Sequence, residues 1–226
     1  MKAQAMILAA GRGERMRPLT DTCPKPLLEV GGKPLIGWHL AALAGAGFAE
    51  AVINTAWLGE QIEQRYGAEA SGVRIRYSHE GEALETAGGI LRALPLLEDG
   101  FCLMAGDVYM PGFAFSPDAL ERFRAGGMLA HLWLVPNPEH NPKGDFGLAA
   151  DGRALNQSEL RYTYSTCGMF RHALFDGLSA GNPEGRKLSL APLLRQAMDR
   201  RLVSAELYTG PWTDVGTPER LAALNS

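Results

Sequence analysis

Three arginines, Arg12, Arg15 and Arg17, lie in a glycine-containing segment just after an apolar run near the start of the chain. Gly11 and Gly13 allow the backbone to turn tightly, so that its N–H groups can approach phosphate oxygens. The guanidinium groups can then offset the negative charge of a triphosphate. The segment predicts a phosphate-binding loop, although a basic glycine turn is also compatible with an ordinary solvated loop.

Lys25 stands between Pro24 and Pro26, a short distance after this loop. Because each proline restricts the backbone around it, the lysine is held in a fixed direction. A lone lysine between prolines is usually a solvated turn. Its position after the basic loop makes Lys25 a candidate for a second contact to phosphates.

Two aspartates are candidate metal ligands. Asp107 follows the apolar run 101–104, and Asp214 precedes a predicted helix start at 217–219. Open α/β sheets bind ligands at the carboxyl ends of their strands, and Mg²⁺ that bridges phosphates usually takes one or two carboxylates from the protein. Either aspartate alone could instead cap a turn or a helix. Together they predict a magnesium site.

Residues 82–89 join a predicted strand end to a helix that starts near Thr86. Small residues there would allow a flat ring to lie against the backbone, and the free N–H groups of a helix start could contact its polar edges. The segment therefore predicts a base-binding wall, although an ordinary helix start has the same composition.

Short apolar runs, which predict strands, alternate with helical patterns along the chain. The predicted strands are 5–9, 51–53, 73–77, 101–104, 129–135, 162–170 and 203–208. The predicted helices are 34–46, 57–66, 86–97, 190–198 and one that starts at 217–219, with loops at 110–117 and 136–145. This order predicts an α/β fold with a mostly parallel central sheet flanked by helices.

The composition fits one domain spanning residues 1–226. With 46% hydrophobic residues, the chain can bury a core without disulfides or a structural metal. The formal net charge of −3 gives no attraction to nucleic acid or to an anionic membrane, so neither is an expected partner. Three cysteines without a C-x-x-C pair fit a reducing compartment, and the first apolar run is too short to cross a bilayer. We therefore expect a cytoplasmic protein.

The motifs L-A-A-G-x-G-x-R-M-x-P-L-T, P-K-P, E-T-A-G-G, G-D and W-x-D-V-G-T-P-x-x-L occur in this order along the chain. In this combination the chain resembles the sugar-1-phosphate nucleotidyltransferases, which implies a single-domain, Rossmann-like nucleotidyltransferase fold. By motif, the resemblance implies catalytic roles for Arg15, Lys25 and Asp107, and Mg²⁺ ligation by Asp107 and Asp214. The implied nucleotide-binding residues are Ala10, Gly11, Arg12, Gly13, Glu14, Arg15, Lys25, Ala87, Gly88 and Ala105. The implied sugar-facing residues are Glu85, Asp145 and Gly168.

Within the family, the runs at 77–82, 144–146 and 190–198 resemble the branch that joins UTP to N-acetylmuramate 1-phosphate in cell-wall sugar recycling. Two departures from the family pattern bear on the site. Glu80 or Glu82 stands where many members have a glutamine for the base, so that recognition of uracil must rely more on the backbone. The common E-K-P lysine is missing. The candidate replacements are Lys143, Arg161 and Lys187.

The resemblance implies a direct transfer that needs no general base. A sugar phosphate has a second pKa of about 6, so that at neutral pH it already carries a nucleophilic oxygen. That oxygen attacks the α-phosphorus of the triphosphate in line with the departing pyrophosphate. Mg²⁺ and Arg15 neutralise the growing charge, and Lys25 aligns the phosphates. The five histidines are then packing or surface residues.

The motifs also allow other reactions of the same class. Glucose 1-phosphate, mannose 1-phosphate, or phosphocholine with CTP are alternative substrates. A different kind of protein, a non-catalytic regulatory subunit that senses a nucleotide sugar, would be expected to lose a metal aspartate or the lysine. This chain keeps Asp107, Asp214 and Lys25, which favours an enzyme.

Overall fold

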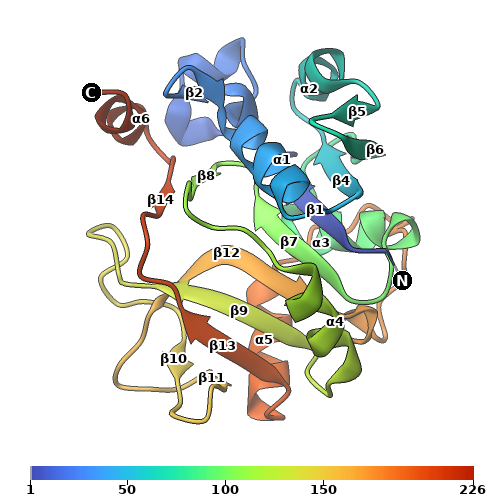
Figure 1. The fold of residues 1–226 in the computed structure, drawn as a ribbon, viewed down its shortest axis with the longest axis vertical. Helices are drawn as coiled ribbons and strands as arrows, with labels where there is room; N and C mark the ends of the chain where they lie inside the picture. The colour runs from blue at the N-terminus through green and yellow to red at the C-terminus, as the bar shows by residue number, and fades with distance from the viewer. Residues whose placement is uncertain (1) are drawn as a thin grey trace.

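A single eight-stranded sheet organises residues 2–226, the part of the chain that the computed structural model describes (Figure 1). The strands lie in the order β13-β9-β12-β7-β1-β4-β6-β5. Their bounds are β1 Gln4–Leu8, β4 Glu50–Thr55, β5 Glu69–Ala70, β6 Val73–His79, β7 Phe101–Ala105, β9 Ala130–Val135, β12 Thr163–Phe170 and β13 Val203–Leu207.

Strand β1 occupies the middle of the parallel part of the sheet. It pairs in parallel with β4 on one side and with β7 on the other, and β6 continues in parallel from β4. Strand β12 runs antiparallel to β7 and β9, β13 is parallel to β9, and β5 is a short antiparallel edge strand. Every strand except β12 and β5 therefore shares one direction, which confirms the predicted mostly parallel sheet. The chain leaves β1 toward β4 and β6 and returns to β7 on the other side, and such a reversal creates a ligand-binding crevice.

Helices cover both faces of the sheet because alternate residues of each central strand face opposite cores (Figure 1). The helices are α1 Leu35–Gly45, α2 Gly59–Tyr66, α3 Glu85–Ala93, α4 Pro117–Ala125, α5 Leu190–Asp199 and α6 Pro218–Leu224. One core joins α1, α2 and α4 to Ile7 and Met104. The other core joins α3 and α5 to Met6 and Leu103.

Short two-stranded ladders attach the connecting segments. They pair β2 Glu29–Val30 with β3 Lys33–Pro34, β8 Val108–Tyr109 with β14 Thr213–Asp214, and β10 Gly147–Leu148 with β11 Ala154–Leu155. The β8–β14 ladder joins the segment after β7 to the segment before α6, two parts of the chain that are far apart in sequence. Helix α6 begins as predicted, with Pro218 in its first turn and Thr217 as its N-cap.

Helix α4 is an element that the sequence analysis missed. The segment before it was expected to be a loop ending at Pro117, and no helix was expected to follow. In the structure the Ser116 side chain accepts a hydrogen bond from the amide of Ala119 at 3.3 Å, and Pro117 takes the first helical position. Proline is favourable there because that position needs no intrahelical N–H donor. The other predicted strands and helices are present with small shifts of their ends. No helix among residues 2–226 is long and apolar enough to cross a membrane.

Candidate active site

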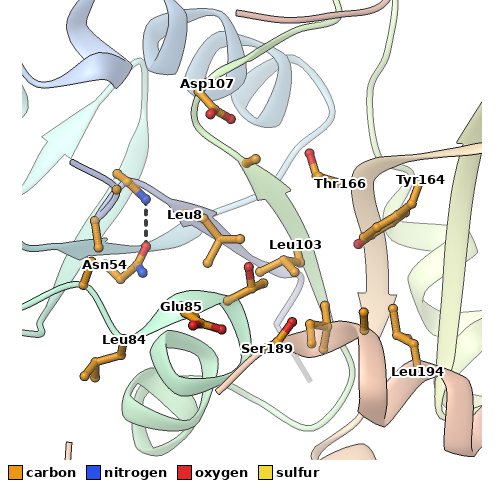
Figure 2. A pocket seen from close by; sticks show the side chains of 18 of the residues that line it. Leu8, Asn54, Leu84, Glu85, Leu103, Asp107, Tyr164, Thr166, Ser189 and Leu194 are labelled. Atoms are coloured by element: carbon orange, nitrogen blue, oxygen red, sulfur yellow. Dashed lines mark hydrogen bonds between the residues drawn. The ribbon is translucent and has the colours of Figure 1, made fainter. Parts of the chain in front are cut away.

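A cavity of about 510 Å³ opens at the carboxyl ends of β1, β4, β6 and β7, the edge at which the sequence placed the site (Figure 2). The lining residues from these strand ends are Leu8, Ala9, Ala10, Gly11, Asn54, Glu80, Ala105 and Asp107. The other wall, from β12 and the start of α5, contributes Tyr164, Thr166, Ser189, Leu190, Ala191, Leu194 and Arg195. The sequence-predicted site residues that line the cavity are Ala10, Gly11, Lys25, Glu85, Ala105, Asp107 and Asp145.

An ion pair between Lys25 and Asp107 lies in this cavity. Lys25 Nζ is 2.5 Å from Asp107 Oδ2, and the lysine side chain is only 12% exposed. Gly106, which follows β7, allows a close approach to the end of β1. Its amide donates to the carbonyl of Leu8 at 2.8 Å, and a Cβ on residue 106 would come within 2.8 Å of that oxygen. The sequence-predicted cation and carboxylate are therefore direct neighbours.

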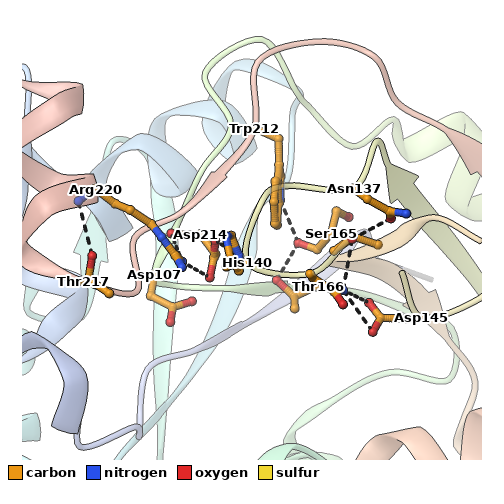
Figure 3. Close-up of polar contacts among 12 residues, drawn as sticks. Asp107, Asn137, His140, Asp145, Ser165, Thr166, Trp212, Asp214, Thr217 and Arg220 are labelled. Carbon is orange, nitrogen blue, oxygen red and sulfur yellow. Dashed lines mark hydrogen bonds and ion pairs between the residues drawn. The ribbon is translucent and has the colours of Figure 1, made fainter. Parts of the chain in front are cut away.

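The β8–β14 ladder brings the second predicted metal aspartate to the first. Asp214 stands opposite Val108, and the amide of Val215 donates to the carbonyl of Asp107 at 2.9 Å. Arg220 Nη1 donates to Asp214 Oδ2 at 2.7 Å, whereas the buried Oδ1 of Asp214 lies 2.9 Å from Nε2 of His140 (Figure 3). Asp214 does not line the main cavity.

Thr20 organises the predicted phosphate loop. Its buried hydroxyl donates to the carbonyl of Gly13 at 2.8 Å. Arg12 folds back onto the same part of the loop, where it donates to the Thr20 carbonyl at 2.7 Å and to Asp21 at 2.9 Å. The Arg12 guanidinium also lies 3.7 Å over the ring of Trp57, and its hydrogen bond to Asp21 lowers the pKa of that carboxyl. Arg12 thus shapes the loop and does not line the cavity, and its contact to a triphosphate stays a prediction.

The rest of the loop divides between the cavity and its surroundings. Gly11 lines the cavity, and a side chain there would meet no atom within 4 Å. Arg15 lies beside the Asp214 segment, with Nη2 3.3 Å from where a Cβ on Gly216 would stand. Glu14 is exposed and pairs with Arg17 at 3.8 Å. Arg15 therefore lies near Asp214, whereas Glu14 does not line the cavity.

A buried hydrogen-bond chain forms the floor of the cavity. The amide of Ala9 donates to Asn54 Oδ1 at 2.8 Å (Figure 2). This bond directs Asn54 Nδ2 toward Glu80 Oε1 at 2.6 Å. The other carboxylate oxygen of Glu80 accepts from the amide of Leu84 at 2.8 Å. Burial raises the pKa of Glu80, and these two donors oppose that shift. Glu80 thus presents hydrogen-bond acceptors at the end of β6.

The start of α3 lines the cavity with Glu85, a predicted site residue, and with Thr86, which was not predicted. Glu85 has a left-handed backbone with φ of 60°, a conformation that is strained for a non-glycine residue. The amides of Ala87 and Gly88 do not face the cavity, because both donate to the carbonyl of Leu188, at 2.9 and 3.1 Å. These two amides are therefore not available to a base in this conformation.

A bulge in β12 shapes the wall of the cavity formed by Tyr164 and Thr166. The register against β9 shifts between Tyr164 and Gly168, and Thr166 within the bulge has a left-handed φ of 63°. Tyr164 and Thr166 consequently line the cavity. Gly168 does not line it, and a Cβ there would meet the ring of Phe170 and the carbonyl of His131. Asp145 Oδ2 accepts from the amide of Tyr164 at 2.8 Å and so holds the bulge in place. The hydroxyl of Tyr164 has no partner among residues 2–226.

A second basic residue besides Lys25 reaches the cavity, and it was not among the three candidate replacements for the E-K-P lysine. Lys143 is exposed, Arg161 donates to the Ser158 carbonyl at 3.1 Å, and Lys187 pairs with the exposed Glu82 at 3.2 Å. Arg195 lines the cavity instead. It donates to Asn156 Oδ1 at 2.7 Å and lies 5.1 Å over the ring of Phe146. The only sequence signal was its place in the predicted helix 190–198, which does not reveal which helix face meets the cavity.

His39 is buried in α1 close to the backbone of Ala105 and Val108, and burial lowers the pKa of His39 to about 4. Below the unfolded value of about 6.5, the unfolded chain therefore binds more protons than the folded chain. We expect the free energy of unfolding to fall as the pH falls from about 6.5 to about 4, by up to about 1.4 kcal/mol per unit. In urea unfolding, the free energy of unfolding should fall less between pH 7 and pH 5 in His39→Leu than in the parent. An equal loss in His39→Leu and in a variant of the exposed His79 would contradict this.

A family model described as nucleotidyl transferase matches residues 4–226. The chain therefore belongs to the nucleotidyl transferase family and is an enzyme of that class, which confirms the resemblance carried by the sequence motifs. The N-acetylmuramate alpha-1-phosphate uridylyltransferase of Neisseria meningitidis is 52% identical over 228 aligned positions, which cover 96% of this chain and 95% of the relative. A protein of the same name from Caulobacter vibrioides is 36% identical and covers 97% of this chain and 94% of its own.

A solved structure from Bacillus anthracis, assigned as a glucose-1-phosphate thymidylyltransferase, superposes with a TM-score of 0.81. The alignment covers 99% of this chain and 94% of that chain at 20% identity. This likeness concerns the fold, and it confirms the predicted Rossmann-like architecture.

Proposed function

We propose that this enzyme transfers the UMP group of UTP to N-acetylmuramate α-1-phosphate, giving UDP-N-acetylmuramate and pyrophosphate. The observation that carries the proposal is the 52% identity, over 96% of the chain, to a relative of that name. The cavity supports it, because Lys25 suits phosphates, Asp107 beside it suits a metal ion that binds phosphates, and Arg195 suits an anionic sugar. We expect residues 1–226 to be one catalytic domain that acts in the cytoplasm, where its product would enter cell-wall sugar recycling.

Asp107 and Asp214 are the proposed ligands of Mg²⁺. The carboxylates of Asp107 and Asp214, which the β8–β14 ladder brings close together, are the oxygen ligands that fit a hard cation. Within residues 2–226, no cluster of three or more His, Cys, Asp or Glu side chains could hold a metal ion. A magnesium site completed by substrate phosphates needs no such cluster. When bound, the ion would neutralise charge on the transferred phosphoryl group.

The residues of the chain itself would position the two substrates for a direct displacement. The sugar phosphate supplies its own nucleophilic oxygen at neutral pH, so that no side chain has to remove a proton. Lys25 would bind triphosphate oxygens beside Gly11, and Arg15 would add positive charge near Asp214. Arg12 would act through the shape of the loop.

Glu80 is the proposed determinant of the base. Both of its oxygens accept N–H groups, from Asn54 and from Leu84, so that its carboxylate offers acceptors and no donor. Uracil has an N–H at ring position 3, whereas cytosine has a bare nitrogen there. Glu80 would favour UTP by accepting the N–H at ring position 3, and it would discriminate only at that position, because the exocyclic amine of cytosine can also donate to a carboxylate.

Replacing Glu80 by glutamine should weaken this discrimination, because an amide can donate to cytosine as well as accept from uracil. We expect the ratio of kcat/KM for UTP to that for CTP to fall by about tenfold, with a stability loss of about 1 kcal/mol from the weaker contact to Asn54 or Leu84. Steady-state rates with each nucleotide measure the ratio. Glu82→Gln, which changes an exposed carboxylate, is the matched control, and an unchanged ratio in Glu80→Gln would exclude Glu80 from base recognition.

Arg195 is the proposed cation for the sugar substrate. N-acetylmuramate 1-phosphate carries a lactyl carboxylate in addition to its phosphate, and a guanidinium suits either anion. Asn156 and Phe146 fix the Arg195 side chain from the wall opposite the nucleotide. Asp145, Tyr164 and Thr166 offer polar atoms for the sugar hydroxyls nearby.

Pyrophosphate release with Mg²⁺ tests the whole proposal, across the four nucleoside triphosphates and a panel of phosphates. The panel contains N-acetylmuramate, N-acetylglucosamine, glucose and mannose 1-phosphates and phosphocholine. A signal confined to UTP with N-acetylmuramate 1-phosphate is the expected result. A signal with another pair would replace the substrate, and no signal from folded protein that binds nucleotide would support a regulatory subunit.

A further inference from the structure

The loop between β9 and β10, residues 136–146, connects the sugar end of the site to the metal end (Figure 3). Asp145 near one end of this loop lines the cavity. His140, within the loop, places its Nε2 2.9 Å from Oδ1 of Asp214. Arg220 holds the other oxygen of the same carboxylate at 2.7 Å. Asp214 is thus flanked by two side chains from different segments.

Nε2 of His140 lies within hydrogen-bonding distance, 2.9 Å, of the buried Oδ1 of Asp214. The imidazole therefore limits the positions that the carboxylate can take, and a carboxylate oxygen has a second lone pair with which it can bind a cation. The His140 side chain is 35% exposed, so that burial in the core does not account for its position.

The base of the 136–146 loop is anchored to β12. Asn141 Nδ2 donates to Thr163 Oγ1 at 3.1 Å and lies 3.3 Å from both oxygens of Asp145. Asn137 Nδ2 donates to the carbonyl of Arg161 at 3.0 Å. Asp145 in turn accepts the amide of Tyr164 in the bulge. A displacement of the loop at His140 would therefore reach the residues that line the sugar end.

We infer that His140 is a positioning residue, which holds the Asp214 carboxylate in place for the metal and couples that carboxylate to the sugar-binding end of the site. The inference rests on the proposed function. A metal-binding carboxylate must keep one orientation, and loss of a side chain that orients a ligand typically lowers metal affinity or activity by about 10- to 100-fold. Because the same loop carries Asp145, the effect should extend to the sugar phosphate. It should spare the nucleotide base, which is bound by the strand ends on the other wall.

His140→Ala tests the inference. We expect the Mg²⁺ concentration for half-maximal activity and the KM for the sugar phosphate each to rise about tenfold. The KM for UTP at saturating Mg²⁺ should stay within about twofold of the parent. Calorimetric titration of the free protein with Mn²⁺ should show a similarly weakened affinity, which does not depend on turnover. His140→Gln, which keeps an N–H group near the carboxylate, should recover part of both losses.

The matched control is His79→Ala, since His79 contacts Thr55 and Glu63 and lies outside the cavity lining. This variant should change none of the three constants. The inference would be overturned if His140→Ala kept the metal dependence of the parent and its KM for the sugar phosphate. So would an equal loss for both substrates together with a lower melting temperature, because that pattern marks a structural role alone. If the parent enzyme is inactive on every phosphate tested, the proposed function fails, while the Mn²⁺ titration still tests the link between His140 and Asp214.

Discussion

Replacing Asp107 by asparagine should lower turnover by about 10³-fold while the protein stays folded. Asparagine keeps the volume of the side chain and removes the charge that would bind the metal beside the phosphates. The expected stability change is small, about 1 kcal/mol or less, because the ion pair with Lys25 is partly exposed. The measurements are kcat for pyrophosphate release at saturating substrates and the midpoint of thermal unfolding.

Asp99 provides the matched control for this change. Its carboxylate accepts the amide of His172 at 2.8 Å and lies 3.4 Å from Arg171, away from the cavity. The backbone hydrogen bond and the nearby Arg171 charge hold the pKa of Asp99 below its usual value, although burial opposes them. Asp99→Asn should therefore lower stability by about 1 kcal/mol and keep kcat. Asp107→Asn that is folded and as active as the parent would refute the assigned role of Asp107.

Replacing Lys25 by methionine should lower kcat/KM for UTP by about 10²-fold. The lysine is a nearly buried cation in the cavity, where an electrostatic contact to phosphate is weakly screened. Methionine retains the apolar stem of the side chain and removes the charge. The effect should appear with UTP at any concentration of sugar phosphate, because Lys25 is assigned to the triphosphate.

Lys33→Met is the control, since Lys33 also precedes a proline but lies 4.7 Å over the ring of Trp38, outside the cavity lining. It should leave kcat/KM unchanged. Combining Lys25→Met with Asp107→Asn should cost little more than Asp107→Asn alone, because residues that act as one unit have non-additive effects. If the activity losses of the two single variants multiply in the double variant, Lys25 and Asp107 serve separate steps.

Much of the site could be predicted because strand ends in a parallel sheet meet at one edge. The apolar runs located β1 and β7, and the residues that follow them, such as Gly11 and Asp107, had to converge. The prolines around Lys25 directed that lysine locally. Helix α4 was missed although its start signal, Ser116 before Pro117, is present, because the composition of residues 110–117 predicts a loop.

The chain by itself thus determined the fold class, the edge that holds the site and the cation and carboxylate at its centre, since these follow from hydrophobic period and local backbone restriction. Tertiary structure alone decided contacts between distant segments. In the folded chain Arg12 lies over Trp57, and β14 pairs with β8 and so places Asp214 near Asp107. The face of α5 that packs toward the cavity carries Arg195. Such choices depend on which surfaces meet when the helices and loops pack against the sheet, and no local pattern encodes them.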